Sequence, residues 1–498
     1  MKFNKLLALV AGILFPLAFA PIHWLGCIFI SCAMLFLILE NSPSARDAAW
    51  CGFWFGIGKY GVGVSWVYLS MAHFTGLPFV FVLMLTLLLV SLFSLYEALA
   101  GWCYSWLKIR YQPASPILSC LNFAATMTLI EVIRSCLFTG FPWLLAGVSL
   151  VESPLSHLAP IIGSMGLSFL LYLLATFLAQ ALFINVNDPL KPYRYGCGFV
   201  LPFLLVPLLL PSDWSHPIIK QPIEIRLLQG NVDQNDKWQE TSLTKILALY
   251  TNMTRENIQN HLVIWPETAF PIPSQYAAHI LKELQQFAQK HHGSVIIGLP
   301  GSNSDNSYSN SALMLSKDQQ RYDKQHLVPF GEYMPFKFLY PFYQQFNIPL
   351  SDLTPGQSND TYFDYKGHKL IPFICFEIAF IDAVQRARIA KGGALLTLTD
   401  DSWFGHSLAL PQHIQIAQMR SLESGRQQAF VSNHGLSALI DSHGKIIKYL
   451  PYDEVATLKA QLRSYEGIPP FLLWGEWPVY LLTIGIMLYL CLRKFISK

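Results

Sequence analysis

The sequence predicts an eight-helix transmembrane bundle into which one α/β sandwich domain is inserted before the last helix. Hydrophobic residues make up 53% of the 498-residue chain and charged residues only 13%, against about 25% charged residues in an average soluble protein. Most of the charge lies after Asp213, and the segment beyond it alternates strand-like and helix-like patterns. We therefore expect a membrane part at residues 1–212, a globular domain at 213–470 and a final membrane helix at 471–498.

Eight apolar segments have the length of a membrane-spanning helix. A hydrocarbon core about 30 Å thick needs roughly 20 apolar residues of helix. Internal prolines are tolerable, because neighbouring helices can satisfy the freed backbone groups. The segments that fit are residues 6–21, 23–39, 49–69, 78–106, 116–136, 161–184, 195–211 and 477–492.

Basic residues occur at alternate connections between these segments. The loops near residues 21–24 and 71–77 carry neither Lys nor Arg. Because Lys and Arg concentrate in cytoplasmic loops, we expect both termini in the cytoplasm and residues 213–470 on the outer side. The residues that mark the cytoplasmic side are Lys2, Lys5, Arg46, Lys108, Arg110, Lys191, Arg194, Arg493, Lys494 and Lys498.

The first apolar segment has a competing interpretation. Lys2 and Lys5 precede an apolar run that ends in the residues Leu-Ala-Phe-Ala at 17–20, which is similar to a signal peptide with a small-x-small cleavage site. Cleavage there would make Pro21 the first mature residue and would upset the alternation of basic loops. A retained helix is the favoured prediction.

The globular segment reads as an α/β sandwich of about 250 residues, which is enough to bury a full core. Strands are expected at 223–228, 262–265, 294–298, 312–315, 370–375, 395–398, 429–432 and 437–440. Helices are expected at 242–260, 274–290, 378–391 and 411–424.

Charge and cysteine content narrow the function classes. A net charge of +3 without a Lys/Arg-rich stripe gives no indication of nucleic-acid binding. Of the nine cysteines only Cys375 lies in the globular segment, which excludes a disulfide framework there. No CxxC motif or Cys/His cluster indicates a zinc site. We expect neither a metal nor another cofactor.

Three short segments of the globular part carry residues suited to nucleophilic catalysis. Each alone has an ordinary structural explanation as a loop or core residue. A thiol with a pKa near 8.5 is mostly protonated at neutral pH, and becomes a nucleophile when a base takes its proton or a positive charge favours the thiolate. A Glu, a Lys and a Cys can supply these groups together. The segments are Trp265-Pro266-Glu267-Thr268, residues 324–333 (KQHLVPFGEY) and Ile374-Cys375-Phe376-Glu377-Ile378.

In this order, the three segments resemble those of the nitrilase, or carbon–nitrogen hydrolase, superfamily, over essentially all of residues 222–470. The resemblance implies an α-β-β-α sandwich. It also implies that Glu267 is the general base, Lys324 stabilises the oxyanion and Cys375 is the nucleophile.

The whole chain resembles the bacterial apolipoprotein N-acyltransferase family, whose layout is seven helices, a domain and one helix. Three departures stand out: Asp400 where that family usually has Asn, Phe376 where Tyr is common, and His434 where Asn or Thr is common. We assign no role to Asp400 or His434. The matching segments are residues 65–71, 131–134, 139–143, 229–231 with Trp238, 403–405 and 419–423 with Arg426.

This second resemblance implies a reaction. An acyl chain, typically the sn-1 chain of phosphatidylethanolamine, passes through a thioester to the N-terminal amine of a diacylglyceryl-cysteine. The acceptor is an apolipoprotein, the step is the last of bacterial lipoprotein maturation, and the site is the periplasmic face of the inner membrane. We expect supporting or substrate-binding roles for Trp238, Glu332, Tyr333, Phe376 and Glu377.

Two other functions use parts of the same pattern. A membrane-tethered amidase or nitrilase would need the same three residues with water as acceptor, but small-amide hydrolysis gives no reason for eight helices. A transporter or receptor would show several polar residues along its helices or an inverted repeat. The apolar segments are nearly devoid of charge and show no repeat.

Overall fold

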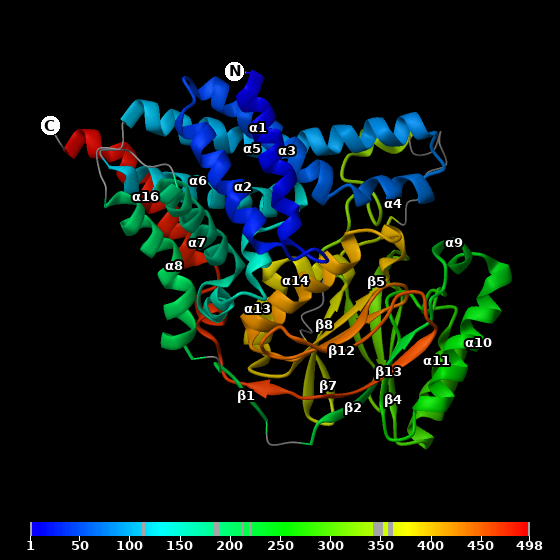
Figure 1. Cartoon of the computed structure of the whole chain (residues 1–498). Coiled ribbons are helices and arrows are strands. Elements are labelled where there is room, and N and C mark those ends of the chain that lie inside the picture. The colour runs from blue at the N-terminus through cyan, green and yellow to red at the C-terminus, as the bar shows by residue number, and fades with distance from the viewer. Residues whose placement is uncertain are drawn as a thin grey trace. The chain divides into compact units, whose positions relative to one another are not determined.

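The computed structural model describes residues 2–111, 115–182, 190–211, 213–218, 221–341, 352–356 and 362–496. The chain forms two compact units (Figure 1). One comprises Met1–Tyr68, Pro78–Ser212 and Leu473–Lys498, and the other Leu69–Leu77 and Asp213–Leu472. The short segment 69–77 was expected as a loop of the membrane part. It belongs to the globular unit, in which the Ser70 hydroxyl donates to the Trp403 carbonyl at 2.7 Å.

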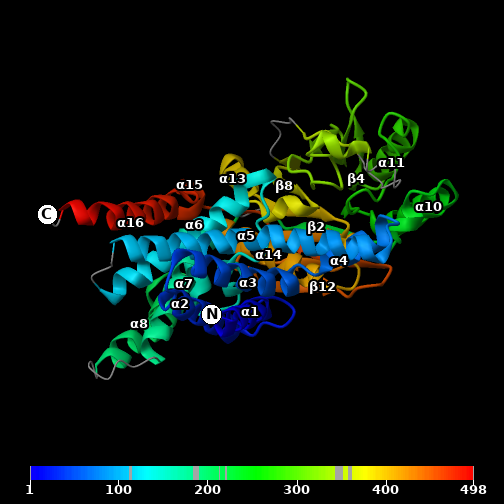
Figure 2. The same cartoon turned by 90° about the horizontal axis from the view of Figure 1, so that it is seen from above.

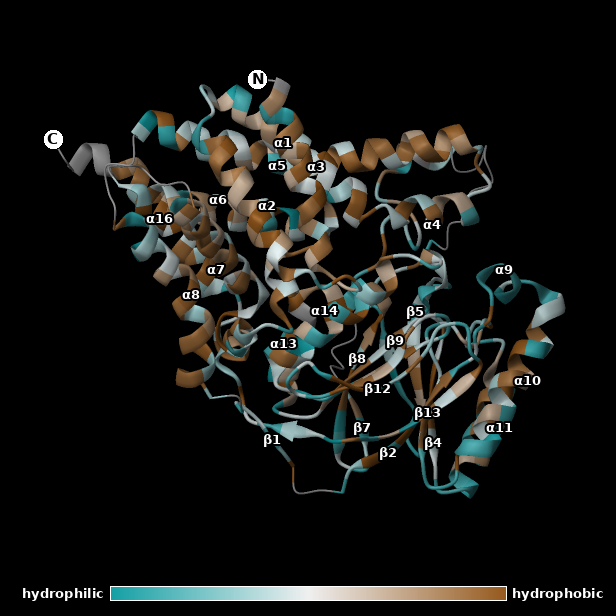
Figure 3. Cartoon of the chain, in the orientation of Figure 1, coloured by the Kyte–Doolittle hydropathy of each residue, from teal (hydrophilic) through white to brown (hydrophobic). Residues whose placement is uncertain are grey.

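The first unit is helical, and a helix lies at each of the eight expected apolar segments. Apolar residues dominate helices such as α5 and α7 (Figure 3). The helices are α1 (Lys2–Leu14), α2 (Leu25–Glu40), α3 (Ala45–Gly63), α5 (Phe79–Tyr111), α6 (Pro116–Cys136), α7 (Ala159–Leu182), α8 (Lys191–Leu209) and α16 (Trp477–Ile496).

Among the described residues, four helical stretches are long and apolar enough to cross a membrane: Phe79–Tyr111, Pro116–Thr139, Pro154–Leu182 and Lys191–Leu209. Three shorter apolar helices lie at Phe3–Ala18, Leu25–Glu40 and Trp477–Leu492. Helix α3 falls in neither group, because it carries Arg46, Asp47 and Lys59. The count of eight crossings therefore remains a prediction.

The third expected span, 49–69, is interrupted in the structure. Helix α3 ends at Gly63, and a separate helix α4 (Trp66–Phe74) follows. Glycine is about 1 kcal/mol less favourable than alanine within a helix. The last turns of α3 contain Gly58, Gly61 and Gly63, which favours an end of the helix there.

Glycines bring α3 and α5 into close contact. A Cβ at Gly52 would lie 2.1 Å from the Glu97 carbonyl oxygen, and one at Gly101 would lie 2.5 Å from that of Ala48. Small residues allow such close helix approach in membranes. The same interface contains a buried ion pair, Lys59 Nζ to Glu97 Oε1, at 2.8 Å.

Glu131 and Arg134 of α6 hold the chain that follows this helix. The Glu131 carboxylate accepts hydrogen bonds from the Ala146 N–H at 3.0 Å and the Tyr172 hydroxyl at 2.7 Å. The Arg134 guanidinium donates to the carbonyls of Phe141 and Trp143, each at 2.6 Å. These bonds support a structural role for both charges.

The globular unit contains two six-stranded sheets. One has the order β13-β2-β3-β4-β5-β6, with β2, β3 and β4 parallel. Its strands are β2 (Ile223–Gln229), β3 (Leu262–Ile264), β4 (Ser294–Ser302), β5 (Tyr308–Leu315), β6 (Gln320–Asp323) and β13 (Ala456–Leu462).

The second sheet has the order β12-β11-β10-β9-β8-β7, with β8, β9 and β10 parallel. Its strands are β7 (Phe363–Tyr365), β8 (His368–Ile374), β9 (Ala394–Thr399), β10 (Gln428–Ser432), β11 (Ser437–Ile440) and β12 (Ile446–Leu450). All eight strands expected from the sequence are present. The strands β6, β7, β12 and β13 were not expected, nor was a two-stranded sheet of β1 (His216–Pro217) and β14 (Tyr465–Glu466).

The sheets pack face to face, because one buried apolar cluster joins residues of both, including Ile225, Leu262, Leu370 and Leu396. Helices α10 (Glu240–Asn257) and α11 (Ala278–Lys290) lie side by side next to the first sheet (Figures 1 and 2). Helices α13 (Ile381–Ala390) and α14 (Ala409–Ser424) contact β8 and β10 of the second. The layers are therefore α-β-β-α.

Candidate active site

The three predicted catalytic residues each follow a strand, and the fold brings them together. Glu267 comes after β3, Lys324 directly after β6 and Cys375 directly after β8. All three are buried, with exposed fractions of 7%, 1% and 7%. The Lys324 ammonium lies 3.5 Å from the Glu267 carboxylate, and both charges act on the Cys375 thiol. Strands from both sheets therefore contribute to one buried cluster.

Both carboxylate oxygens of Glu267 accept hydrogen bonds from neighbouring residues. Oε1 accepts a hydrogen bond from the Asn310 side chain at 2.7 Å, and Oε2 accepts one from the Asp400 backbone N–H at 2.9 Å. Burial raises the pKa of Glu267, Lys324 lowers it, and the negative charges of Glu332 and Asp400 raise it. The net pKa is raised, so this carboxylate is a stronger proton acceptor than a surface glutamate.

Lys324 lies between two carboxylates. Its ammonium donates to Glu332 Oε1 at 2.8 Å, and Glu332 Oε2 accepts from the Val328 N–H at 2.7 Å. The Asn310 amide also donates to Glu332, at 2.8 Å. Burial lowers the pKa of Lys324, but the charges of Glu332 and Glu267 outweigh it and raise the pKa above its usual value. Lys324 is therefore a fixed positive charge inside the cluster.

Cys375 has a backbone conformation that few side chains adopt. Its φ is +55°, at the turn from β8 into the short helix η6 (Cys375–Ala379). A non-glycine residue at positive φ is uncommon, and such strain is typical of functional sites. Burial raises the pKa of the thiol well above its usual value, Glu267 raises it further, and Lys324 lowers it. The thiol therefore needs a base to become a nucleophile.

A histidine holds the carbonyl of the same turn. The Nε2 atom of His413 lies 3.2 Å from the Cys375 carbonyl oxygen. Its Nδ1 atom lies 2.9 Å from Asp401 Oδ1. The Thr399 hydroxyl also donates to Asp401, at 2.9 Å.

A buried thiol, a buried carboxylate and a fixed ammonium can together carry out acyl transfer through a thioester.

Comparison with known families and proteins matches both units. Residues 11–177 match the apolipoprotein N-acyltransferase N-terminal domain, and residues 224–466 match the carbon–nitrogen hydrolase family. The apolipoprotein N-acyltransferase of Azotobacter vinelandii is 36% identical over 99% of this chain and 95% of its own length. That of Coxiella burnetii is 34% identical over 99% of this chain and 100% of its own.

The chain belongs to the apolipoprotein N-acyltransferase family. It is thus an acyltransferase of lipoprotein biosynthesis, and with its apolar helices it is a membrane protein. Its globular unit has the nitrilase-like fold. Among solved structures, the nitrilase-superfamily protein Nit3 of Saccharomyces cerevisiae is 17% identical with a TM-score of 0.36, covering 50% of this chain and 93% of that chain.

Glu377, expected from the N-acyltransferase resemblance to orient a catalytic group, holds the backbone around the cluster. Its Oε1 accepts from the Gln325 N–H at 2.7 Å, and Oε2 accepts from the Ile374 N–H at 2.8 Å. The Tyr322 hydroxyl also donates to it, at 2.9 Å. Glu377 thereby ties the residue after Lys324 to the residue before Cys375, which is the work of a positioning residue.

The other supporting residues expected for an N-acyltransferase lie around this cluster in different settings. Trp238 ends the short helix α9 (Gln234–Lys237) and is 55% exposed. The Tyr333 carbonyl accepts from the Phe330 N–H at 2.8 Å. Phe376 packs edge-on against Phe380, with ring centroids 5.0 Å apart.

Asp400, a departure from the family pattern, pairs with a buried lysine that we did not predict. The Lys237 ammonium forms an ion pair with the Asp400 carboxylate and donates to the Glu267 carbonyl oxygen at 3.3 Å. The Asn433 amide donates to both Asp400 carboxylate oxygens, at 3.2 Å each. The bond from Asp400 to Glu267 uses the backbone N–H, so this side-chain change leaves it intact.

Asn310, Lys237 and His413 contact the cluster, and sequence reasoning missed all three. Asn310 lies in β5 and bridges Glu267 and Glu332. A lone Asn in a strand gives no sequence signal of this. The one available signal for Lys237 was its position next to Trp238, inside a segment that matches the family.

Proposed function

We propose that Cys375 carries the acyl group from a phospholipid to the N-terminal amine of an apolipoprotein. The observation that supports this most is the buried Glu267–Lys324 pair at 3.5 Å acting on the Cys375 thiol. These residues come from a chain whose relatives are apolipoprotein N-acyltransferases. We assign Glu267 as general base, Lys324 as oxyanion partner and Cys375 as nucleophile.

In the first half-reaction, Glu267 takes the Cys375 proton and the thiolate attacks the ester carbonyl of the phospholipid. The negative oxygen of the tetrahedral intermediate is stabilised by the Lys324 ammonium. Collapse breaks the ester C–O bond and forms the thioester. The leaving lysophospholipid oxygen takes the proton back from Glu267, so that charge and protons balance.

In the second half-reaction, the neutral amine of the diacylglyceryl-cysteine attacks the thioester and Glu267 takes its proton. Collapse forms the amide and releases the Cys375 thiolate, which regains a proton from Glu267. Water must be kept from the thioester, and burial of Cys375 at 7% exposure favours this. The aromatic residues Trp238, Tyr333 and Phe376 are our candidates for contacts to the lipid chains or the acceptor.

We assign all eight apolar helices as membrane crossings, with both termini in the cytoplasm and the globular domain on the periplasmic side of the inner membrane. The basic residues at alternate connections support this orientation. We take the sn-1 chain of phosphatidylethanolamine as the donor, because it is the typical donor that the family resemblance implies.

The product test is mass spectrometry of a diacylated lipopeptide incubated with phosphatidylethanolamine and the purified protein. We expect the mass of one additional acyl chain on the N-terminal amine. Release of free fatty acid with no change in the lipopeptide would instead favour hydrolysis, the rival chemistry of the same residues.

A further inference from the structure

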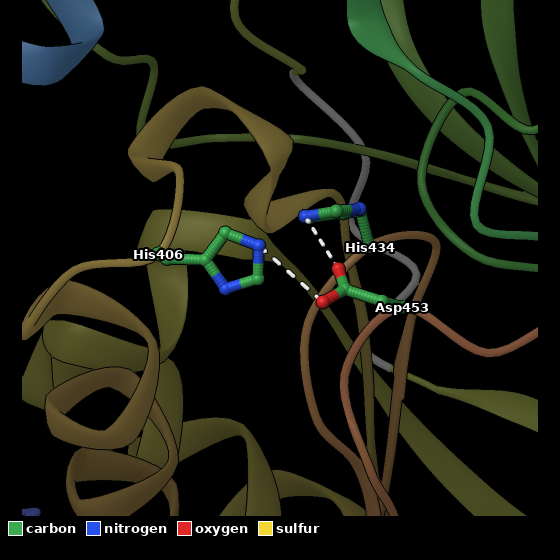
Figure 4. A group of neighbouring side chains, drawn as sticks. All are labelled: His406, His434 and Asp453. Atoms are coloured by element: carbon green, nitrogen blue, oxygen red, sulfur yellow. Dashed lines mark ion pairs between the residues drawn. The ribbon is translucent and has the colours of Figure 1, made fainter.

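We propose that His406, His434 and Asp453 form a binding site for a divalent transition-metal ion of the Zn²⁺ type, separate from the catalytic cluster. Figure 4 shows the two imidazole rings next to the Asp453 carboxylate, each with a nitrogen facing a different carboxylate oxygen. Each residue offers one ligand atom, and these atoms all lie within 4.8 Å of one another.

The two histidine nitrogens face different oxygens of the Asp453 carboxylate, at separations that suit a bound metal ion. His406 Nε2 lies 3.3 Å from Asp453 Oδ2, and His434 Nε2 lies 3.5 Å from Asp453 Oδ1. Good N–H···O hydrogen bonds measure about 2.7–3.2 Å. Ligands bound tetrahedrally to Zn²⁺ at about 2.0–2.2 Å lie about 3.4 Å apart. The observed distances are close to that separation.

One ligand is already oriented for coordination. The His434 Nδ1 lies 2.7 Å from the amide oxygen of Asn231. An amide oxygen accepts only, so Nδ1 carries the hydrogen and neutral His434 presents a free lone pair at Nε2. A second hydrogen-bond partner that fixes the tautomer is a regular feature of metal-binding histidines. Two imidazoles and one carboxylate are a donor set that Zn²⁺ accepts.

The site joins three loops of the globular unit. His406 lies between η7 (Asp401–Phe404) and α14, His434 between β10 and β11, and Asp453 between β12 and β13. No ligand spacing is visible along the chain, which explains why the sequence indicated no zinc motif. A bound ion would hold the three loops together.

The loop that carries His434 is connected to the catalytic cluster by hydrogen bonds. His434 directly follows Asn433, whose amide binds the Asp400 carboxylate. An ion at His434 would therefore stabilise a loop that is two contacts from Glu267.

The test is Zn²⁺ binding to the full chain in detergent without a polyhistidine tag, measured by calorimetry. We expect one Zn²⁺ to bind with a Kd at least tenfold weaker in H406A and in D453N than in the unaltered protein. His406 is 70% exposed at its side chain, so H406A should fold normally. Zn²⁺ should also raise the Tm of the unaltered protein, and should not raise that of H406A.

Two control variants separate this site from others. His443 pairs with Asp213 at 2.8 Å in a site with a single histidine, so H443A should bind Zn²⁺ as the unaltered protein does. C375A should also retain binding, because the catalytic thiol is not a ligand. The proposal is wrong if the unaltered protein binds no Zn²⁺, if H406A and D453N bind it as tightly as the unaltered protein, or if C375A loses it.

Discussion

At the scale of single residues, the cluster around Glu267 places two positive and three negative groups in a buried space. Lys324 pairs with Glu332 and Glu267, and Lys237 pairs with Asp400. Each buried charge has an opposite partner, as it must when water is excluded. The sequence predicted the triad because its three motifs occur in family order. It could not predict the Lys237–Asp400 pair, which only the fold brings together.

Two variants, E267Q and K324R, test the proposed base and the proposed oxyanion partner separately. E267Q cannot accept a proton, so both half-reactions should slow by roughly 10²–10⁴-fold. K324R keeps the charge but changes its shape and reach, and acylation should slow by roughly 10²–10³-fold. Single-turnover acylation with phospholipid, followed by addition of a diacylated lipopeptide, measures both steps. If K324R acylates at nearly the normal rate, the proposed oxyanion role has to be given up.

The pKa of Glu267, which burial raises most, should set the acid limit of the reaction, and Glu332 should shift that limit. The negative charge of Glu332 raises the pKa of Glu267. A raised pKa keeps Glu267 protonated to a higher pH, and only the carboxylate form can take a proton. Activity should therefore fall as the pH drops through this raised pKa. E332Q removes the charge, lowers the pKa of Glu267 and should move the acid limb of the pH–rate profile to lower pH.

The control for this pH shift is E283Q. Glu283 is an exposed residue of α11 that faces His279, and its removal should leave the acid limb in place. A limb that stays unchanged in E332Q, or moves to higher pH, would contradict the assignment of Glu267 as the titrating base.

At the scale of elements, sequence reasoning found the eight interior strands of the two six-stranded sheets. It missed the four edge strands of these sheets and the two-stranded sheet of β1 and β14. Interior strands such as β3 and β9 are buried throughout and consist mainly of apolar residues. The edge strands β12 and β13 are partly exposed and carry charged residues. Exposure weakens the hydrophobic signal, so β6, which leads into Lys324, could be placed only through the motif.

Strand β4 sets the position of Glu267, the proposed general base. A Cβ at Gly298 would lie 2.4 Å from the Pro266 carbonyl oxygen and 2.7 Å from the Glu267 Cα. G298A must therefore displace the turn that carries Glu267. Acylation should fall on the order of 10²-fold, the effect of a shift of about 1 Å in a catalytic group.

The matched control is G331A, where the nearest atom to a new Cβ is Val328 Cγ1 at 3.7 Å, an ordinary contact. Initial acylation rates of the two variants give the comparison. Equal rates would show that the backbone contact of β4 with Glu267 is not needed.

At the scale of the whole molecule, the sequence separated an apolar part from a charged one, and the structure divides the chain next to residue 213. It did not predict that residues 69–77 join the globular unit, because their contact with Trp403 crosses more than three hundred residues of chain. Helix α3 is a second case in which a contact between distant residues could not be predicted from the sequence. Its buried Lys59 lowers the apolar signal, and the partner Glu97 lies on another helix.

The orientation of the chain in the membrane is testable with reporters. A phosphatase that is active only in the periplasm should be active when fused after Ser212 and inactive when fused at Lys498. The physical reason is the confinement of basic residues to alternate connections. The reverse pattern would place the globular domain in the cytoplasm, away from lipoproteins whose signal peptides have been removed.

The central claim is that Cys375 carries the acyl group. The direct measurement is mass spectrometry of the Cys375 peptide after incubation with labelled phosphatidylethanolamine, and again after addition of a diacylated lipopeptide. We predict a labelled thioester at Cys375 that disappears as the label reaches the lipopeptide amine. No label should be bound in C375A, while alanine at Cys120 or Cys491 should leave it unchanged. Full labelling of C375A, or label that never leaves the enzyme, would contradict the account.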